Sequence, residues 1–171
     1  MPTEVPSNES PKTIALIGAT PIAERIASRA LSASHRVIID DISDTRLQAI
    51  SAKLGAVHSS LSLTQSIESA IRAADFIIDA LPDDIEVKLE LFTLFDKFAK
   101  PDAIFITTGS VPIDDLAAIT FCPDRCVAVR LASVPDTRDV TVELIAATLT
   151  SSLTLAKCTD LFLQSLGFRE T

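Results

Sequence analysis

The sequence predicts a doubly wound α/β domain with a mostly parallel sheet, formed as a single domain by residues 12–171. Three observations predict this fold. Short apolar segments alternate along the chain with segments of helical periodicity. The first apolar segment, 13–17, runs into Gly18 and then into a helical pattern. The next apolar segment, 37–41, ends in two acids. Strands that alternate with helices favour a parallel sheet covered by helices on both faces.

The first two helices carry clear sequence signals. The first is expected to begin at Pro21, because proline suits a first turn in which its missing N–H is not needed. Its apolar residues stand at 22, 23, 26, 27, 30 and 31, which is the spacing of one helical face. Asp44 is expected to cap the second helix, and Gly55 is expected to end it.

The rest of the chain continues the alternation. Further strands are expected over 57–63, 76–81, 103–107, 127–132 and 142–148. Further helices are expected over 64–73, from 82–84 onward, over 114–120 and over 151–166. The acids Asp83 and Asp84 favour the N-terminus of the long helix that they open. Gly167 is expected to stop the last helix.

The composition excludes several classes of function. The net charge is −8 and Lys and Arg do not cluster, which argues against nucleic acid and anionic membranes as partners. Residues 1–11 are polar, so we expect a disordered leader rather than a secretory signal or an Arg-rich transit peptide. No apolar run reaches the roughly 18 residues of a membrane span. Three cysteines without a signal peptide indicate a reducing, cytoplasmic location.

Few side chains are suited to proton transfer near neutral pH. The chain has no Tyr, and we expect its two histidines, His35 and His58, to be solvated. Cys122 and Cys126 lie four residues apart with no histidine or second cysteine pair nearby, so no metal site is expected.

The turn after the first strand has part of a nucleotide-binding pattern. A dinucleotide-binding βαβ unit has three glycines in this turn and an acid at the end of its second strand. Here Gly18 occupies the first glycine position, Thr20 the second and Ala23 the third. Thr20 adds bulk where the backbone approaches the pyrophosphate, and Pro21 removes a backbone donor. Two interpretations stay open: a bound nucleotide, or an inherited loop with nothing bound.

The most specific segment is 74–92, in which a buried strand leads to Asp83, Asp84 and a helix with Lys88. With segments 101–105, 107–110, 126–130 and 142–144, it resembles the NAD-binding domain of 3-hydroxyacyl-CoA dehydrogenases over about residues 12–168. The resemblance implies a Rossmann-like fold, NAD as the cofactor and an oxidoreductase of fatty acid metabolism.

The resemblance also implies residue roles. Asp41 matches the acid that holds the adenosine ribose, which favours NAD over NADP. Ser110 matches a serine near the substrate hydroxyl, and Glu143 matches the acid that orients the catalytic histidine. The residues expected on the cofactor are Gly18, Thr20, Pro21, Ile22, Asp41, Ala80, Asp83 and Lys88.

The departures from the family pattern lie at positions that take part in the family's reaction. Arg130 stands where the family has its histidine base, and arginine cannot accept a proton. In the resemblance, Thr108 stands at the position of the family's asparagine near the nicotinamide. Ser133 stands at the position of a second asparagine of the family. A helical hairpin that holds CoA is missing between residues 50 and 62, and the chain ends before the family's helical domain. We expect Arg130 and Glu143 to form a partly buried ion pair at the crevice.

Three functions therefore stay open. The chain is a 3-hydroxyacyl-CoA dehydrogenase-like domain, weak in NAD binding and catalytically impaired alone, whose substrate domain comes from a partner subunit or a homo-oligomer. Alternatively, it is a nucleotide-binding module without chemistry. The third reading is a non-enzymatic structural or partner subunit, a pseudoenzyme that keeps the fold without a nucleotide.

Overall fold

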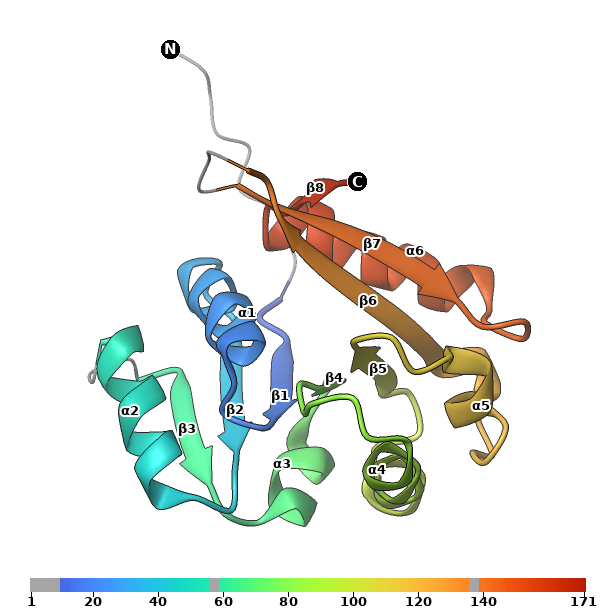
Figure 1. Ribbon diagram of the computed structural model, residues 1–171, viewed down its shortest axis with the longest axis horizontal. Coiled ribbons are helices and arrows are strands. Elements are labelled where there is room, and N and C mark those ends of the chain that lie inside the picture. The colour runs from blue at the N-terminus through green and yellow to red at the C-terminus, as the bar shows by residue number, and fades with distance from the viewer. Residues whose placement is uncertain (1–9, 56–58, 136–138) are drawn as a thin grey trace.

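The computed structural model of the protein describes residues 10–55, 59–135 and 139–171 (Figure 1). Its strands are β1 Thr13–Ile17, β2 Arg36–Asp40, β3 Leu61–Thr64, β4 Phe76–Asp79, β5 Ile104–Thr108, β6 Cys126–Ser133, β7 Val140–Ala146 and β8 Arg169–Glu170. Its helices are α1 Pro21–Ser32, α2 Asp44–Leu54, α3 Ile67–Ala73, α4 Ile85–Phe98, α5 Ile113–Ala117 and α6 Ser152–Thr159. A short 3₁₀ helix, η1, covers Pro123–Arg125, and a π-helical segment, η2, covers Asp160–Ser165.

All described strands belong to one sheet with the order β3-β2-β1-β4-β5-β6-β7-β8. Neighbours from β3 to β6 pair in parallel, β7 runs antiparallel to β6, and β8 is parallel to β7. This confirms the doubly wound, mostly parallel, Rossmann-like fold. The strand order reverses between β1 and β4, and ligands of such sheets bind at the carboxyl ends of the strands on either side of this point.

The two faces of the sheet bury two separate apolar clusters. In β1, Ile14 and Leu16 point into the cluster formed with α1, α2 and α6, whereas Ala15 and Ile17 point into the cluster formed with α3, α4 and α5. Successive residues of a strand face opposite sides, so a central strand needs apolar residues at every position. This explains the unbroken apolar runs of the sequence.

Several element boundaries differ from the prediction because polar side chains cap the helices. Ser43, not Asp44, caps α2, and its hydroxyl accepts the Arg46 N–H. Ser66 caps α3, which begins at Ile67 rather than at Thr64. The final helix is α-helical only to Thr159 and continues as the π segment. The strand expected over 57–63 is β3, although residues 56–58 lie outside the described residues.

The prediction that His35 is solvated is wrong. Its side chain lies between the start of β1 and the π segment and is 4% exposed. Nδ1 accepts the Lys12 N–H at 3.1 Å, and Nε2 lies 2.6 Å from the Ser165 hydroxyl. His35 therefore joins two distant segments of the chain. His58 and most of the expected leader, residues 1–9, lie outside the described residues.

Candidate functional site

The loop after β1 is shaped by a glycine that no other residue replaces easily. Gly18 has φ of +102°, and its N–H donates to the Asp40 carbonyl at 2.8 Å. A Cβ at this position would come within 2.7 Å of Leu81 Cδ2. Both the positive φ and the close approach of the turn after β4 favour glycine, because L side chains rarely adopt this backbone conformation.

Thr20 spans the point at which the strand order reverses. Its hydroxyl donates to the Ala80 carbonyl at 2.8 Å, and it accepts the Ala23 N–H at 3.4 Å as the cap of α1. Pro21 is the first residue of α1 and has no N–H. The start of a helix binds phosphate through its unpaired N–H groups. Two of the first three residues of α1 thus offer no unpaired donor.

Asp41 lies directly after β2, and its side chain is 4% exposed. Its carboxylate accepts the N–H groups of Ala19, at 2.9 Å, and Ser43, at 2.8 Å. Arg46 adds a two-pronged contact, with Nε 3.0 Å from Oδ2 and Nη2 2.5 Å from Oδ1. Burial opposes ionisation, but these hydrogen bonds hold the pKa of Asp41 below its ordinary value. The acid expected to hold a ribose is engaged within the chain.

Asp40, the last residue of β2, has a different environment. It is 6% exposed, and its Oδ1 has no hydrogen-bond partner among the described residues. Burial, together with the neighbouring negative charge of Asp41, raises the pKa of Asp40 to about 6. The pKa values of these two adjacent acids are therefore shifted in opposite directions.

A buried ion pair lies beneath the carboxyl ends of β4 and β5. Lys88 of α4 and Asp79 of β4 are both fully buried, with Nζ 2.6 Å from Oδ2. The ammonium group also lies 3.0 Å from the Thr108 carbonyl and 3.2 Å from the Leu81 carbonyl. The Thr107 hydroxyl donates to the same carboxylate oxygen at 2.8 Å. Lys88, expected to face the cofactor, is thus placed below the crevice, 4.0 Å from Asp83.

Asp83 links the turn after β4 to the turn after β5 through hydrogen bonds. Its carboxylate accepts the Ser110 hydroxyl at 2.7 Å and the Ser110 N–H at 3.0 Å. These bonds, with the hydroxyl contributing most, lower the pKa of Asp83. Gly109 has φ of +97°, and a Cβ there would overlap the Asp83 carboxylate at 2.1 Å. Ser110 is a structural partner of Asp83 in this arrangement.

Arg130 and Glu143 face each other across β6 and β7. Their charged groups lie 3.9 Å apart, and their side chains are 54% and 52% exposed. The two residues face each other at the crevice as expected, but about half of each side chain is in solvent, and such exposed pairs contribute little to stability.

The predicted catalytic positions and several cofactor positions nevertheless converge. They line one open cavity of about 380 Å³ at the carboxyl ends of the strands. Its walls include Ile22, Asp83, Thr108, Ser110, Arg130 and Glu143. The Thr108 hydroxyl is used internally, because it donates to the Asp79 carbonyl at 2.9 Å. Ser133, at the second replaced asparagine, accepts from Arg25 at 2.9 Å.

The described residues contain no group of three or more His, Cys, Asp or Glu side chains placed to hold a metal. Cys122, Cys126 and Cys158 are free and buried, and burial raises their pKa values to about 11, 12 and 12. No helix in the described part of the chain is long and apolar enough to cross a membrane.

The sequence reasoning missed Arg46 and Asp79 as site residues. Arg46 stands five residues after Asp41 in the first turn of α2, where a long side chain reaches back to the strand end. Asp79 is an acid inside a buried strand, with Lys88 nine residues later. A buried charge requires a partner, so an acid inside an apolar strand could have predicted a nearby cation such as Lys88.

The fold, the glycine turn and the crevice define a dinucleotide-binding domain of the Rossmann type. The chain belongs to the family of the 3-hydroxyacyl-CoA dehydrogenase NAD-binding domain, which matches residues 49–167. The match begins after the glycine loop and Asp41, and it includes Asp79, Lys88, Arg130 and Glu143.

Relatives agree with this assignment. L-carnitine dehydrogenase from Pseudomonas sp. is 32% identical over 132 residues, which is 68% of this chain and 41% of that protein. Mitochondrial hydroxyacyl-coenzyme A dehydrogenase from Sus scrofa is 33% identical over 110 residues, or 64% of this chain and 34% of that protein. The chain thus spans less than half of these relatives.

Solved structures share the fold. (S)-3-hydroxybutyryl-CoA dehydrogenase PaaH1 from Ralstonia eutropha superposes with a TM-score of 0.82 at 23% identity, covering 94% of this chain and 62% of that one. The NAD⁺-dependent 5-formyl-3-hydroxy-2-methylpyridine 4-carboxylic acid 5-dehydrogenase gives a TM-score of 0.81 at 23% identity, covering 95% and 57%. At this identity the likeness establishes the fold alone.

The first prediction concerns the buried ion pair. Replacing Lys88 by Met leaves the Asp79 carboxylate buried without its cation, so we expect a loss of about 3–5 kcal/mol in the free energy of unfolding. Urea denaturation measures it. Arg72→Ala is the control, because it breaks an exposed ion pair with Glu68 and should cost less than about 1 kcal/mol. Equal small losses in both variants would show that the pair is not buried in solution.

The second prediction concerns pH. The folded chain keeps a proton on Asp40 that the unfolded chain releases near pH 3.8, so this stabilisation is present at low pH and is lost as the pH rises through about 6. Asp40→Asn should therefore gain about 1–3 kcal/mol over the wild type between about pH 4 and pH 7. Urea denaturation at several pH values measures the difference. A difference that does not change with pH would contradict the raised pKa.

Proposed function

We propose that the chain is the NAD-binding domain of a 3-hydroxyacyl-CoA dehydrogenase-like protein that binds NAD weakly and does not oxidise a substrate on its own. The observation that carries the proposal is the internal use of the groups expected to meet the cofactor. The Thr20 hydroxyl is bound to the Ala80 carbonyl, and the Asp41 carboxylate is bound to Arg46. A dinucleotide must compete with these contacts.

The fit to NAD is nevertheless partial rather than absent. Gly18 keeps the tight turn, and a depression of about 100 Å³ between the loop and α2 is walled by Thr20, Pro21 and Arg46. It lies on the Asp41 side of the crevice, where the adenosine half of a dinucleotide would bind. NAD would supply the hydride acceptor, and the residues of the chain would hold and orient it.

The proposal of impaired chemistry rests on Arg130. Oxidation of an alcohol requires that a base remove the hydroxyl proton, and a guanidinium cannot accept one. The nearby Ser110 hydroxyl donates to the Asp83 carboxylate, and the lowered pKa of Asp83 makes it a weak proton acceptor. The relatives are dehydrogenases by name, but this chain spans less than half of those compared by sequence. A substrate domain from a partner subunit or a second copy remains part of this proposal.

The third prediction tests cofactor binding. We expect wild-type NADH affinity to be weak, with a Kd above about 100 μM, and Arg46→Ala or Thr20→Gly to tighten it by about threefold to tenfold, which corresponds to about 1 kcal/mol. Titration of NADH fluorescence measures the Kd, and the chain contains no Trp to interfere. Thr20→Gly should fold, because glycine is nearly as good a helix cap as threonine.

Arg72→Ala serves again as the control, since it removes a positive charge far from the crevice and should leave the Kd unchanged. Tight NADH binding by the wild type would contradict the proposal of weak cofactor binding. A Kd that neither loop variant changes would contradict it as well. No binding by any variant would favour the alternative of a structural subunit without nucleotide.

The fourth prediction tests the missing base. The purified chain should not turn over 3-hydroxybutyryl-CoA with NAD, and Arg130→His should stay far below the usual kcat of about 1 s⁻¹ or more, because the Thr108 and Ser133 hydroxyls are engaged elsewhere. Arg130→Gln is the matched control without a base. Turnover near 1 s⁻¹ in Arg130→His alone would show that Arg130 is the only chemical defect.

A further inference from the structure

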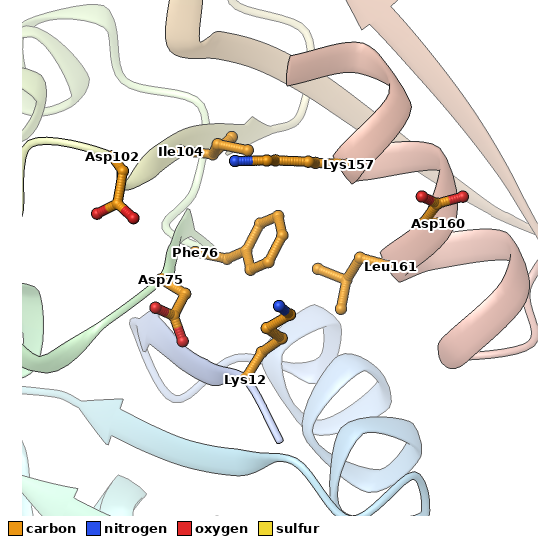
Figure 2. Close-up of a pocket in the computed structure, with 8 residues that line it drawn as sticks. All are labelled: Lys12, Asp75, Phe76, Asp102, Ile104, Lys157, Asp160 and Leu161. Carbon is orange, nitrogen blue, oxygen red and sulfur yellow. The ribbon is translucent and has the colours of Figure 1, made fainter. Parts of the chain in front are cut away.

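Another cavity opens at the end of the sheet opposite the crevice. It has a volume of about 160 Å³ and lies where β1, β4 and β5 begin, next to α6 and the π segment (Figure 2). Phe76, Ile104 and Leu161 form its apolar lining, and each is at most 5% exposed. They belong to the apolar cluster of the α1 and α6 face, which ends in this opening. An enclosed cavity of about 150 Å³ accommodates benzene, so the volume of this cavity, although it is open to solvent, suits a ring-sized body.

Two ammonium groups reach this lining. Lys12, just before β1, and Lys157 of α6 extend toward the Phe76 ring from opposite sides in Figure 2. Within the described ranges, no carboxylate oxygen lies within 4.0 Å of either Nζ atom. The charge of Lys12 also acts on the Asp75 carboxylate, but that carboxylate is already paired with Lys100. Two cations without an ion pair beside an apolar pocket favour an anionic ligand with an apolar body.

Three acids also line the cavity. Asp75 is already engaged, because it accepts Lys100 at 2.5 Å and the Thr13 N–H at 2.7 Å. Asp102 and Asp160 are exposed and lie at the outer edges of the cavity in Figure 2. They repel a multiply charged anion more strongly than a singly charged one. The two lysines attract such an anion more strongly in the same proportion, so the preference over inorganic phosphate comes from the apolar body that packs on the lining.

The wall that carries Leu161 is held in place from behind. Leu161 begins the π turn, in which its carbonyl accepts the Leu166 N–H at 2.8 Å. His35 contacts Ser165, and Arg29 donates to the Gly167 carbonyl at 2.6 Å. Single π turns within helices occur often at functional sites. Ligand binding at this wall would need little rearrangement, which lowers its entropic cost.

We propose that this cavity binds a small monocarboxylate with a ring-sized or branched apolar body. The carboxylate is bound by Lys12 and Lys157, and the body packs against Phe76, Ile104 and Leu161. The site is separate from the crevice and does not depend on the proposed cofactor binding.

The fifth prediction uses benzoate as the probe. Titration of the ¹⁵N-labelled chain, followed by NMR, should give saturable shifts around Phe76 and Leu161, with a Kd on the order of 1 mM for so small a ligand. Benzamide has the same shape without the charge, and benzylamine has the opposite charge. Both should bind at least about fivefold more weakly, as should inorganic phosphate.

Lys157→Met and Lys12→Met should each raise the benzoate Kd by about fivefold, which corresponds to about 1 kcal/mol. Lys97→Met is the control, because Lys97 is an exposed lysine of α4 that stacks on Phe98. The ¹⁵N spectrum of each variant reports its fold. Equal binding of benzamide, an unchanged Kd in both cavity variants, shifts confined to the Gly18 loop, or no saturation by about 20 mM benzoate would each overturn the proposal.

Discussion

The crevice end of this domain depends on one buried ion pair, between Lys88 and Asp79. Two charges inside an apolar sheet are tolerated only when hydrogen bonds satisfy the rest of their polar atoms. Here the carbonyls of Leu81 and Thr108 and the hydroxyl of Thr107 complete the network. Because these groups come from β4, β5 and the turn after β4, the pair fixes the turn after β4 and the end of β5, which shape the crevice. The pair explains why the carboxyl ends of two neighbouring strands can be polar beneath the surface.

Above this network, the polar groups of the crevice bind one another. Thr20 donates to the Ala80 carbonyl, Ser110 donates to Asp83, and Arg46 donates to Asp41. Buried polar atoms need partners whether or not a ligand supplies them. Here the partners come from groups of the chain that lie within reach of one another. The open cavity lined by Arg130 and Glu143 differs, since its charges are half solvated and need no such partner.

The strands and the reversal point of the sheet could be predicted from the sequence, because central parallel strands need apolar residues on both faces. The strand β1 shows this directly, with four buried residues in its five. The partners of polar side chains could not be predicted. Arg46 reaches Asp41 because three residues separate β2 from α2, and His35 is buried because the π segment passes beside it. Such contacts depend on how distant elements meet, and a periodic pattern does not encode that.

The contacts of Asp41 have a consequence for what an acid at this position means. Its carboxylate joins the backbone after β1 to the first turn of α2, through Ala19 and Ser43. Substituting it would leave buried donors unpaired, so natural selection for a folded domain is enough to retain the acid. The acid directly after β2 is therefore explained by the architecture of this chain, and its presence alone is no measure of whether a coenzyme is bound.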